Sequence, residues 1–396
     1  MIETSRRVAR LPTYAVAAIA ERKRRLIAQG VDVIDLGAGD ADISPPEIAV
    51  EVLHRAAQQR DASRYAFQLG SVEFREAVAR YMQRRFNVQV DPMTEVLPLI
   101  GSKDGLAHLP FAVLDPGDVC VVPEPGYPAY LGGAILAGAD VEIVPLRPEA
   151  DFLVELEEIP PERLARAKLV FLNYPNNPTA AIAPHAYLER TIAACRRHGI
   201  VLAFDNAYAE LTFDGYRAPS ILEFSGARDV ALEFHSLSKS FGMTGWRLGW
   251  AVGNQRLIEG LSKVKSYVDT GPFLAVQQAG AAVIDRSEEL LEPVREGFRV
   301  RRDSLVTALH EVGISCAPPP ATMYLWVPVP EGITSGELAS ALLEREGLVI
   351  LAGSVFGGGG EGFVRLSFIV EPERLREAAV RMSRVLDGFT ATGRRA

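Results

Sequence analysis

The segment VALEFHSLSKSFG, residues 230–242, decides the fold, because it joins a short apolar run directly to a polar turn that carries a lysine. Residues 230–234 have the length and composition of a strand that is buried on both faces of a sheet. The turn that follows contains Lys239 among small hydroxyl side chains. Ligand groups collect at the carboxyl ends of strands in open α/β sheets, so this pattern predicts a functional site around Lys239.

The same pattern of a short apolar run followed by a helix-length segment recurs towards the N-terminus. The further apolar runs cover residues 96–100, 119–122, 141–144, 169–172 and 200–204. Apolar runs linked by amphipathic helices indicate a mostly parallel sheet with helices on both faces. The sequence therefore predicts a large, doubly wound α/β domain.

Beyond residue 253 the pattern changes to long helices and then to a mixture of strands and helices. We expect helices at 255–268, 273–285, 288–312, 335–345 and 371–386, and strands at 323–329, 348–351 and 363–369. This order predicts a smaller α+β domain, bordered by the proline-containing segments 43–46 and 318–320. The predicted division is an N-terminal arm with part of the small domain at 1–45, a large domain at 46–289 and a small C-terminal domain at 290–396.

The composition is that of an ordinary globular protein. Of the 396 residues, 48% are hydrophobic and 23% are charged, and the formal net charge of -8 argues against a broad nucleic-acid surface. The cysteines, at 120, 195 and 316, have the spacing of neither a disulfide framework nor a zinc site. No run reaches the ~18 apolar residues of a membrane span, and the first residues lack a signal-peptide pattern. We therefore expect a cytoplasmic protein without a nucleic-acid or membrane partner.

Lys239 is the strongest candidate for covalent chemistry. The chain has only six lysines, and Gly242 and Arg247 follow this one closely. A lysine that is desolvated near another cation loses its proton readily and can form an imine with an aldehyde. From its spacing alone, a solvated surface lysine is an equally good interpretation.

Other expected strand ends also carry polar groups. Asp205 follows the run 200–204 and is either a carboxylate paired with a buried cation or a helix N-cap, and Tyr208 lies three residues further on. The turn NYPNNPT, residues 173–179, is made rigid by two prolines. The stretch IGSKDG, residues 100–105, has the glycine and hydroxyl of a phosphate-binding helix N-terminus, a pattern that is also common elsewhere.

Two other signals are set aside. The glycine-rich run 357–362 precedes an expected strand rather than a helix, so it is not a dinucleotide fingerprint, and we expect a mobile loop there. The six histidines show no metal-ligand pairing, so no metal site is predicted.

Taken together, these residues resemble those of the class I/II aminotransferases of fold type I. The segment SLSKSFGMTGWRLG, residues 236–249, is similar almost letter for letter to the signature around the family's cofactor lysine. The resemblance runs from about residue 11 to the last helix. It implies the α/β PLP-transferase fold, pyridoxal 5'-phosphate as cofactor, and ping-pong transfer of an amino group between an amino acid and a 2-oxo acid.

The resemblance also implies roles for individual residues at the cofactor. Lys239 would hold the cofactor and move a proton between Cα and C4′, and Asp205 would pair with the pyridine nitrogen. Tyr208 and Asn177 would contact the ring hydroxyl, and Tyr127 would stack on the ring. The implied phosphate ligands are Ser102, Lys103, Ser236 and Arg247.

Further residues are implied to bind the substrate or a second subunit. Arg365 matches the arginine that grips the substrate α-carboxylate, together with Gly39 and Asn177. Tyr65 resembles the tyrosine that reaches the phosphate of the neighbouring subunit, which implies a homodimer.

Within the family, segments 101–108, 174–181 and 214–220 are most similar to bacterial LL-diaminopimelate aminotransferases, which implies LL-diaminopimelate and 2-oxoglutarate as substrates in lysine biosynthesis. Aspartate, alanine or another amino acid is the alternative donor, and a β-lyase or a non-catalytic PLP-binding regulator would share the fold. Ala41, Ala180 and Ala352 stand where the family pattern has proline, glycine and proline. Two of these positions are expected in loops that close over the substrate.

Overall fold

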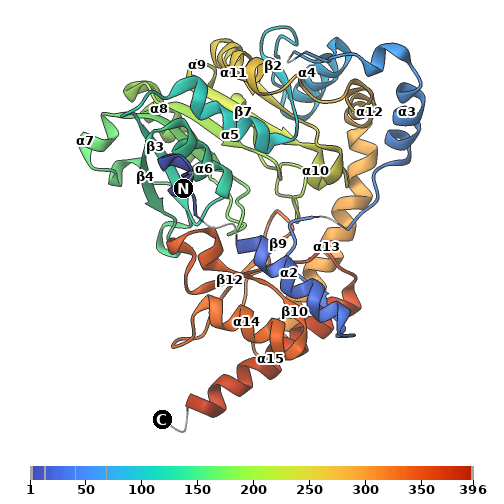
Figure 1. Ribbon diagram of the computed structural model, residues 1–396, viewed down its shortest axis with the longest axis vertical. Coiled ribbons are helices and arrows are strands. Elements are labelled where there is room, and N and C mark those ends of the chain that lie inside the picture. The colour runs from blue at the N-terminus through green and yellow to red at the C-terminus, as the bar shows by residue number, and fades with distance from the viewer. Residues whose placement is uncertain (1–2, 13–14, 41, 68, 394–396) are drawn as a thin grey trace.

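The structure is a computed structural model that describes residues 3–12, 15–40, 42–67 and 69–393. Figure 1 shows a large sheet flanked by helices in the upper part of the molecule and smaller sheets with helices below it. Helix α13, Ser287–Glu311, runs from the upper part into the lower part.

Among the described residues, seven strands form the large sheet, in the order β2-β8-β7-β6-β5-β3-β4. Their bounds are β2 Val96–Leu99, β3 Val119–Glu124, β4 Asp140–Pro145, β5 Ala167–Asn173, β6 Val201–Asp205, β7 Ala231–Ser236 and β8 Gly249–Gly253. Neighbouring strands are parallel except for β8, which is antiparallel to both β2 and β7. The predicted mostly parallel sheet is confirmed, but β8 was not predicted, because its short run begins and ends in glycine.

Helices cover both faces of this sheet, as the apolar strands require. The longer ones are α3 Glu47–Ala57, α4 Val72–Phe86, α5 Ser102–Val113, α6 Pro128–Ala137, α8 His185–His198, α11 Gln255–Val268 and α12 Leu274–Asp285. The short ones are α1 Arg6–Ala9, α7 Pro161–Leu164, α9 Ala227–Val230 and α10 Leu237–Ser240. Alternate residues of β3 enter different cores: Val121 packs with residues of α4, α8 and α12, and Val122 with residues of α5, α6 and α11.

The lower part gathers both ends of the chain. Its elements are α2 Ala15–Ala28, β1 Ile34–Asp35, β9 Tyr324–Pro328, α14 Ser335–Glu346, β10 Leu348–Val349, β11 Leu351–Ala352, β12 Phe363–Ser367 and α15 Pro372–Gly393. β1 pairs with β10, whereas β11, β12 and β9 form a separate antiparallel sheet. The expectation of one strand at 348–351 was wrong, because this run supplies two short strands to different sheets.

Helix α13 connects two hydrophobic cores. Leu291, near its start, packs in the core of the large sheet, and Phe298 packs in the core of the lower part. The predicted domain limits near residues 45 and 289 are compatible with this packing and stay a prediction. Within the described part of the chain, no helix has the length and apolar character needed to cross a bilayer.

Candidate active site

Three neighbouring strands of the large sheet end in polar residues at one edge. β5, β6 and β7 are parallel, and their last residues are Asn173, Asp205 and Ser236. Helix α10 follows β7 directly, so Lys239 lies at the same edge. The topology thus collects these side chains where open α/β sheets bind ligands.

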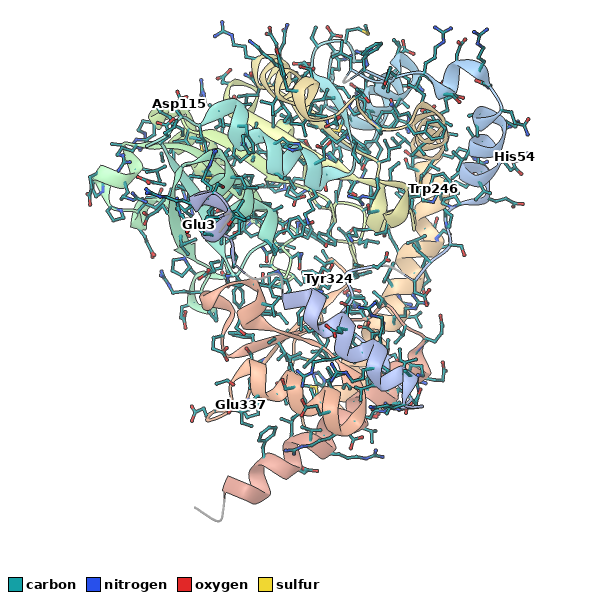
Figure 2. All side chains as sticks on the ribbon, in the orientation of Figure 1. Glu3, His54, Asp115, Trp246, Tyr324 and Glu337 are labelled. Atoms are coloured by element: carbon teal, nitrogen blue, oxygen red, sulfur yellow. The ribbon has the colours of Figure 1, made fainter. Side chains whose placement is uncertain are left out.

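A cavity of about 270 Å³ adjoins these strand ends and contains nearly all of the predicted site residues. It is lined by Gly39, Ser102, Lys103, Tyr127, Asn177, Asp205, Tyr208, Ser236, Lys239, Arg247 and Arg365. Tyr65 is not among them; it lies in a separate surface cavity with Phe67 and Phe273. Tyr324 also lines the main cavity, and Figure 2 places it where the upper and lower parts meet.

Asp205 is a buried carboxylate with only one of its oxygens in a hydrogen bond. Its Oδ2 accepts a bond of 2.6 Å from the phenol of Tyr130, while its Oδ1 is buried without a partner among the described residues. Burial raises the pKa of Asp205 to about 6, because the charged form loses its hydration. Such an oxygen is suited to accept a hydrogen bond from a cationic group.

The amine of Lys239 is held in the cavity by a hydrogen bond, and the short helix that carries it is capped. It donates a hydrogen bond to the main-chain oxygen of Gly39, which belongs to the N-terminal part of the chain. Ser236 caps α10, because its Oγ accepts a bond of 3.1 Å from the amide of Ser238. The lysine is half-buried and reaches the cavity beside Asp205.

Arg365, on β12, contributes a buried guanidinium to the wall of the cavity. It donates to Oδ1 of Asn177 and to the main-chain oxygen of Gly37, both at 2.9 Å. Its guanidinium carbon lies 4.0 Å from the ring centroid of Tyr324 and 4.9 Å from that of Phe356. Aromatic contacts on a guanidinium fix its plane, and a fixed plane favours bidentate binding of a carboxylate.

The N-terminus of α5 forms an anion-binding corner of the cavity. Gly101 precedes the helix with a φ of 75°, a conformation that favours glycine, and a Cβ there would lie 2.3 Å from Nη2 of Arg247. Arg247 is held by a bond of 2.9 Å from Nη1 to the carbonyl of Thr244. The N-terminus of α5, the Ser102 hydroxyl and this guanidinium together suit a phosphate.

The turn 173–179 is held by its own side chains. Asn173 donates to the main-chain oxygen of Asp205 at 2.8 Å, and its Oδ1 accepts from the amide of Asn177 at 2.7 Å. Asn177 is thereby fixed relative to the end of β6. In this position its Oδ1 accepts the hydrogen bond from Arg365.

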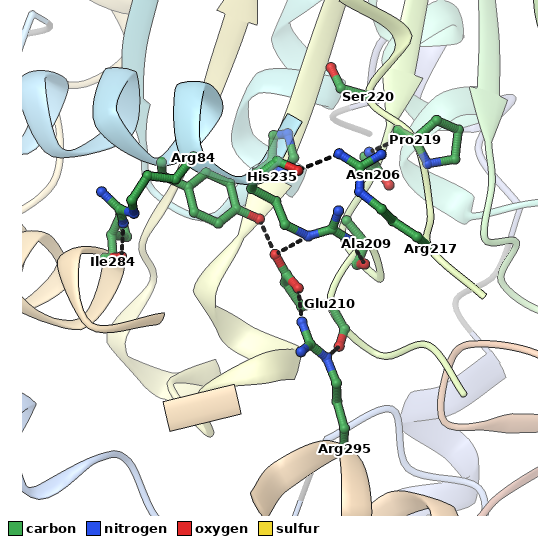
Figure 3. Close-up of polar contacts among 12 residues, drawn as sticks. Arg84, Asn206, Ala209, Glu210, Arg217, Pro219, Ser220, His235, Ile284 and Arg295 are labelled. Atoms are coloured by element: carbon green, nitrogen blue, oxygen red, sulfur yellow. Dashed lines mark hydrogen bonds and ion pairs between the residues drawn. The ribbon is translucent and has the colours of Figure 1, made fainter. Parts of the chain in front are cut away.

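The segment after β6 is anchored by two half-buried arginines that pair with the buried carboxylate of Glu210 (Figure 3). Glu210 accepts hydrogen bonds from Tyr81 at 2.6 Å and from Nε of Arg85 at 3.0 Å. Arg295 of α13 pairs with the same carboxylate and also donates to the main-chain oxygen of Glu210 at 2.8 Å. These contacts fix the backbone two residues beyond Tyr208.

The sequence did not reveal three aromatic residues of the site. Tyr130 lies one helical turn after Tyr127 in α6, and that spacing could have placed it beside the cavity. The hydroxyl of Tyr324 lies 2.9 Å from that of Tyr208, and strand alternation alone did not identify it. Phe356 lies in the turn after β11, where the sequence gives no periodic signal.

The three departures from the family pattern differ in their structural setting. Ala41 lies outside the described residues. Ala180 is buried and has a φ of 59°, a left-handed conformation that glycine adopts more easily. Ala352 belongs to β11 and pairs with Val364.

Comparison with known proteins identifies the family. The family model for aminotransferase class I and II matches residues 31–382. The chain belongs to the class I and II aminotransferases. LL-diaminopimelate aminotransferases from Nitratidesulfovibrio vulgaris and Aquifex aeolicus are each 45% identical to it, over 96% of this chain and 98% and 99% of their own. The substrate-bound structure of BacF from Bacillus subtilis matches with a TM-score of 0.94 and 34% identity, over 97% of this chain and 98% of BacF.

As a member of this family, the aminotransferase is a pyridoxal-phosphate-dependent enzyme that acts on amino acids and 2-oxo acids. The residues of the cavity fit the cofactor. The unpartnered Oδ1 of Asp205 can accept from a protonated ring nitrogen, the corner at Ser102 and Arg247 suits the phosphate, and the amine of Lys239 suits the aldehyde. The predicted fold, enzyme class and cofactor are confirmed.

Proposed function

We propose that this aminotransferase transfers an amino group from LL-diaminopimelate to 2-oxoglutarate, with Lys239 as the residue that moves the proton. The observation that carries the choice of donor is the 45% identity, over 96% of the chain, to LL-diaminopimelate aminotransferases from two bacteria. The match spans both the large sheet and the lower part, so it includes the residues on each side of the cavity.

Bound pyridoxal phosphate supplies an electron sink for the negative charge that develops at the substrate Cα. We assign Asp205 to the ring nitrogen, because its unpartnered oxygen is buried in the cavity wall. Tyr208 and Asn177 are assigned to the ring hydroxyl, and Tyr127 to the ring face. Their common position around one cavity supports these assignments.

Lys239 is assigned both to hold the cofactor and to move the proton. With the cofactor bound, the amine of Lys239 would act as the base that moves the proton between the substrate Cα and C4′. The bond between Lys239 and the carbonyl of Gly39 supports this role, because it keeps the amine at the side of the cavity that faces Arg365 and Gly39, our candidates for the substrate carboxylate.

The cofactor phosphate is assigned to the corner at the start of α5. Its proposed ligands are the helix amides and the side chains of Ser102, Lys103, Ser236 and Arg247. A dianion gains most from fixed donors of this kind, because they need no reorganisation when it binds.

The substrate side chain would contact an apolar wall. Leu351, Val355 and Phe356 line the cavity near Arg365, and among its described lining residues Asp205 is the sole carboxylate. The methylene chain of diaminopimelate fits this wall, but its distal ammonium finds no acidic partner there. This observation favours, as a second candidate, a donor with an aliphatic or aromatic side chain.

A homodimer is supported by an apolar patch on the surface. The patch consists of Tyr65, Phe67 and Phe273, which line one surface cavity, and of Tyr267 and Val268, which end α11 just before residues 270–273 of that cavity. Tyr267 is 88% and Tyr65 is 71% exposed. Contiguous exposed aromatic side chains mark interaction surfaces. A second copy of the chain would cover the patch and bring Tyr65 to the neighbouring phosphate.

Sedimentation velocity tests this assembly. We expect a dimer for the wild type and a monomer for Tyr267→Asp, while Met93→Asp, a change at another exposed apolar residue, keeps the dimer. A monomeric wild type would contradict the proposal.

We also place the enzyme in the cytoplasm, which is consistent with Cys120 and Cys195 being buried as free thiols.

Steady-state transamination with a panel of donors and 2-oxoglutarate tests the choice of substrate. We expect kcat/KM for LL-diaminopimelate to exceed that for aspartate, alanine and phenylalanine by about tenfold or more, the discrimination that apolar contacts with a substrate side chain provide. A preference for phenylalanine or leucine would favour the second candidate instead.

A further inference from the structure

The glycine run 357–360, part of the segment 357–362 in which we expected a mobile loop, is packed against Glu124 at the end of β3. The amide of Gly359 donates a hydrogen bond of 3.0 Å to Oε2 of Glu124. A Cβ at Gly359 would lie 2.7 Å from the main-chain oxygen of Glu124, and one at Gly357 would lie 2.2 Å from its Cγ. The lack of side chains in the run is therefore what permits this close approach.

A second contact attaches the same turn to the large sheet. The amide of Gly126, two residues beyond Glu124, donates 2.9 Å to the carbonyl of Phe356. The two ends of the turn also lie close together, since a Cβ at Gly360 would lie 2.2 Å from the carbonyl oxygen of Gly353. The segment that follows β11 in the lower part is thus held to the end of β3 in the upper part.

The attached turn positions an aromatic side chain over the proposed carboxylate site. Phe356 lines the cavity, lies 4.9 Å from the guanidinium of Arg365, and packs edge-on against Trp326. An apolar cover excludes water from an ion pair and so strengthens it.

We propose that Glu124 and the glycine run 357–360 form a clasp that holds Phe356 over Arg365, and that Glu124 is a positioning residue for substrate binding. The inference rests on the assignment of Arg365 to the substrate carboxylate. Neither Glu124 nor the run lines the cavity, so the clasp acts on the affinity for the amino acid and the oxo acid and leaves the affinity for the cofactor unchanged.

Two alanine substitutions at adjacent glycines provide a matched test. A Cβ at Gly358 would meet only Oε2 of Glu124, at an ordinary 3.6 Å, whereas a Cβ at Gly359 would collide with the backbone. In the PLP-loaded enzyme, Gly359→Ala should raise KM for both substrates about tenfold with kcat within about twofold, the signature of lost substrate binding. Gly358→Ala should keep the wild-type KM, and both variants should keep the wild-type dissociation constant for pyridoxal phosphate.

Changes at Glu124 test the other half of the clasp and cover the case in which Gly359→Ala fails to fold. Glu124→Ala should raise KM in the same way, and Glu124→Gln, which retains an acceptor for the amide of Gly359, should restore it. The clasp is overturned if Glu124→Ala has the wild-type KM, or if KM and the cofactor dissociation constant rise together. A wild-type KM in Arg365→Lys would instead overturn the carboxylate assignment of the proposed function.

Discussion

The phenol of Tyr130 donates a hydrogen bond of 2.6 Å to Oδ2 of Asp205, so a helix residue is the direct partner of the buried carboxylate. The ring of Tyr130 stacks on Phe171 of β5, with 4.7 Å between the centroids, which fixes the direction of the hydroxyl. One carboxylate oxygen is thereby bonded to the protein, and the other has no partner among the described residues, as our assignment of Asp205 to the cofactor nitrogen requires.

Tyr130→Phe should shift the pH dependence of transamination. The hydrogen bond from Tyr130 lowers the pKa of Asp205 against the larger effect of burial, so its loss raises that pKa further. Activity requires the ionised carboxylate and falls as the pH drops through its pKa. The acidic limb of the kcat/KM profile should therefore move to higher pH, with about a tenfold loss on that limb, as expected for a hydrogen bond to a charged group. An unchanged limb would contradict the role of Tyr130.

Asp205→Asn should stabilise the protein without cofactor. The pKa of Asp205 is raised in the folded state to about 6, from 3.8, so the folded state favours the protonated form. Its ionisation destabilises the fold by up to about 3 kcal/mol above about pH 6, and this cost vanishes below about pH 4. In thermal unfolding of apoprotein, the variant should have the higher Tm at about pH 8 and lose this advantage towards about pH 4. If the wild type and the variant have the same Tm as each other at both pH values, ionisation of Asp205 does not destabilise the fold.

Ala180→Gly should stabilise the fold by about 1 kcal/mol, because Ala180 has a φ of 59° that disfavours a Cβ. The matched control is Ala181→Gly, because the neighbouring Ala181 does not have a positive φ. This control should lose about 0.5–1 kcal/mol through the entropy of the unfolded chain. Urea unfolding measures both changes, and equal effects of the two substitutions would refute the explanation.

Glu210→Gln should destabilise the protein by about 3 kcal/mol or more, because Arg85 and Arg295 lose a buried counter-ion. Glu158→Gln is the control, since its ion pair with Arg147 is exposed to solvent and its loss should change the stability little. Denaturant midpoints at constant m-value give both numbers. Similar losses in the two variants would mean that burial of the Glu210 network has little effect.

The parallel strands of the large sheet and most of the cavity follow from local signals in the sequence. Short apolar runs give the parallel strands, and polar residues directly after them, such as Asp205 and Lys239, mark the edge where the site forms. These signals are informative because the alternation of side chains and the length of a strand are both determined by a few neighbouring residues.

The features that were missed depend on contacts between distant parts of the chain. The partner of Asp205 is Tyr130, 75 residues away, and the pocket wall at Phe356 is held by Glu124. The glycine run looked like a mobile loop because its packing against Glu124 leaves no trace in its own composition. Likewise, the division of residues 348–352 between two sheets depends on pairing with β1 and β12.

The absorbance spectrum of the PLP-loaded protein tests most directly the central claim that Lys239 makes this cavity a transamination site. We predict a visible band that declines when LL-diaminopimelate is added alone and returns when 2-oxoglutarate follows, with both changes abolished in Lys239→Ala. A wild type that stays colourless after addition of pyridoxal phosphate, or a Lys239→Ala variant that completes the cycle at the wild-type rate, would contradict the account.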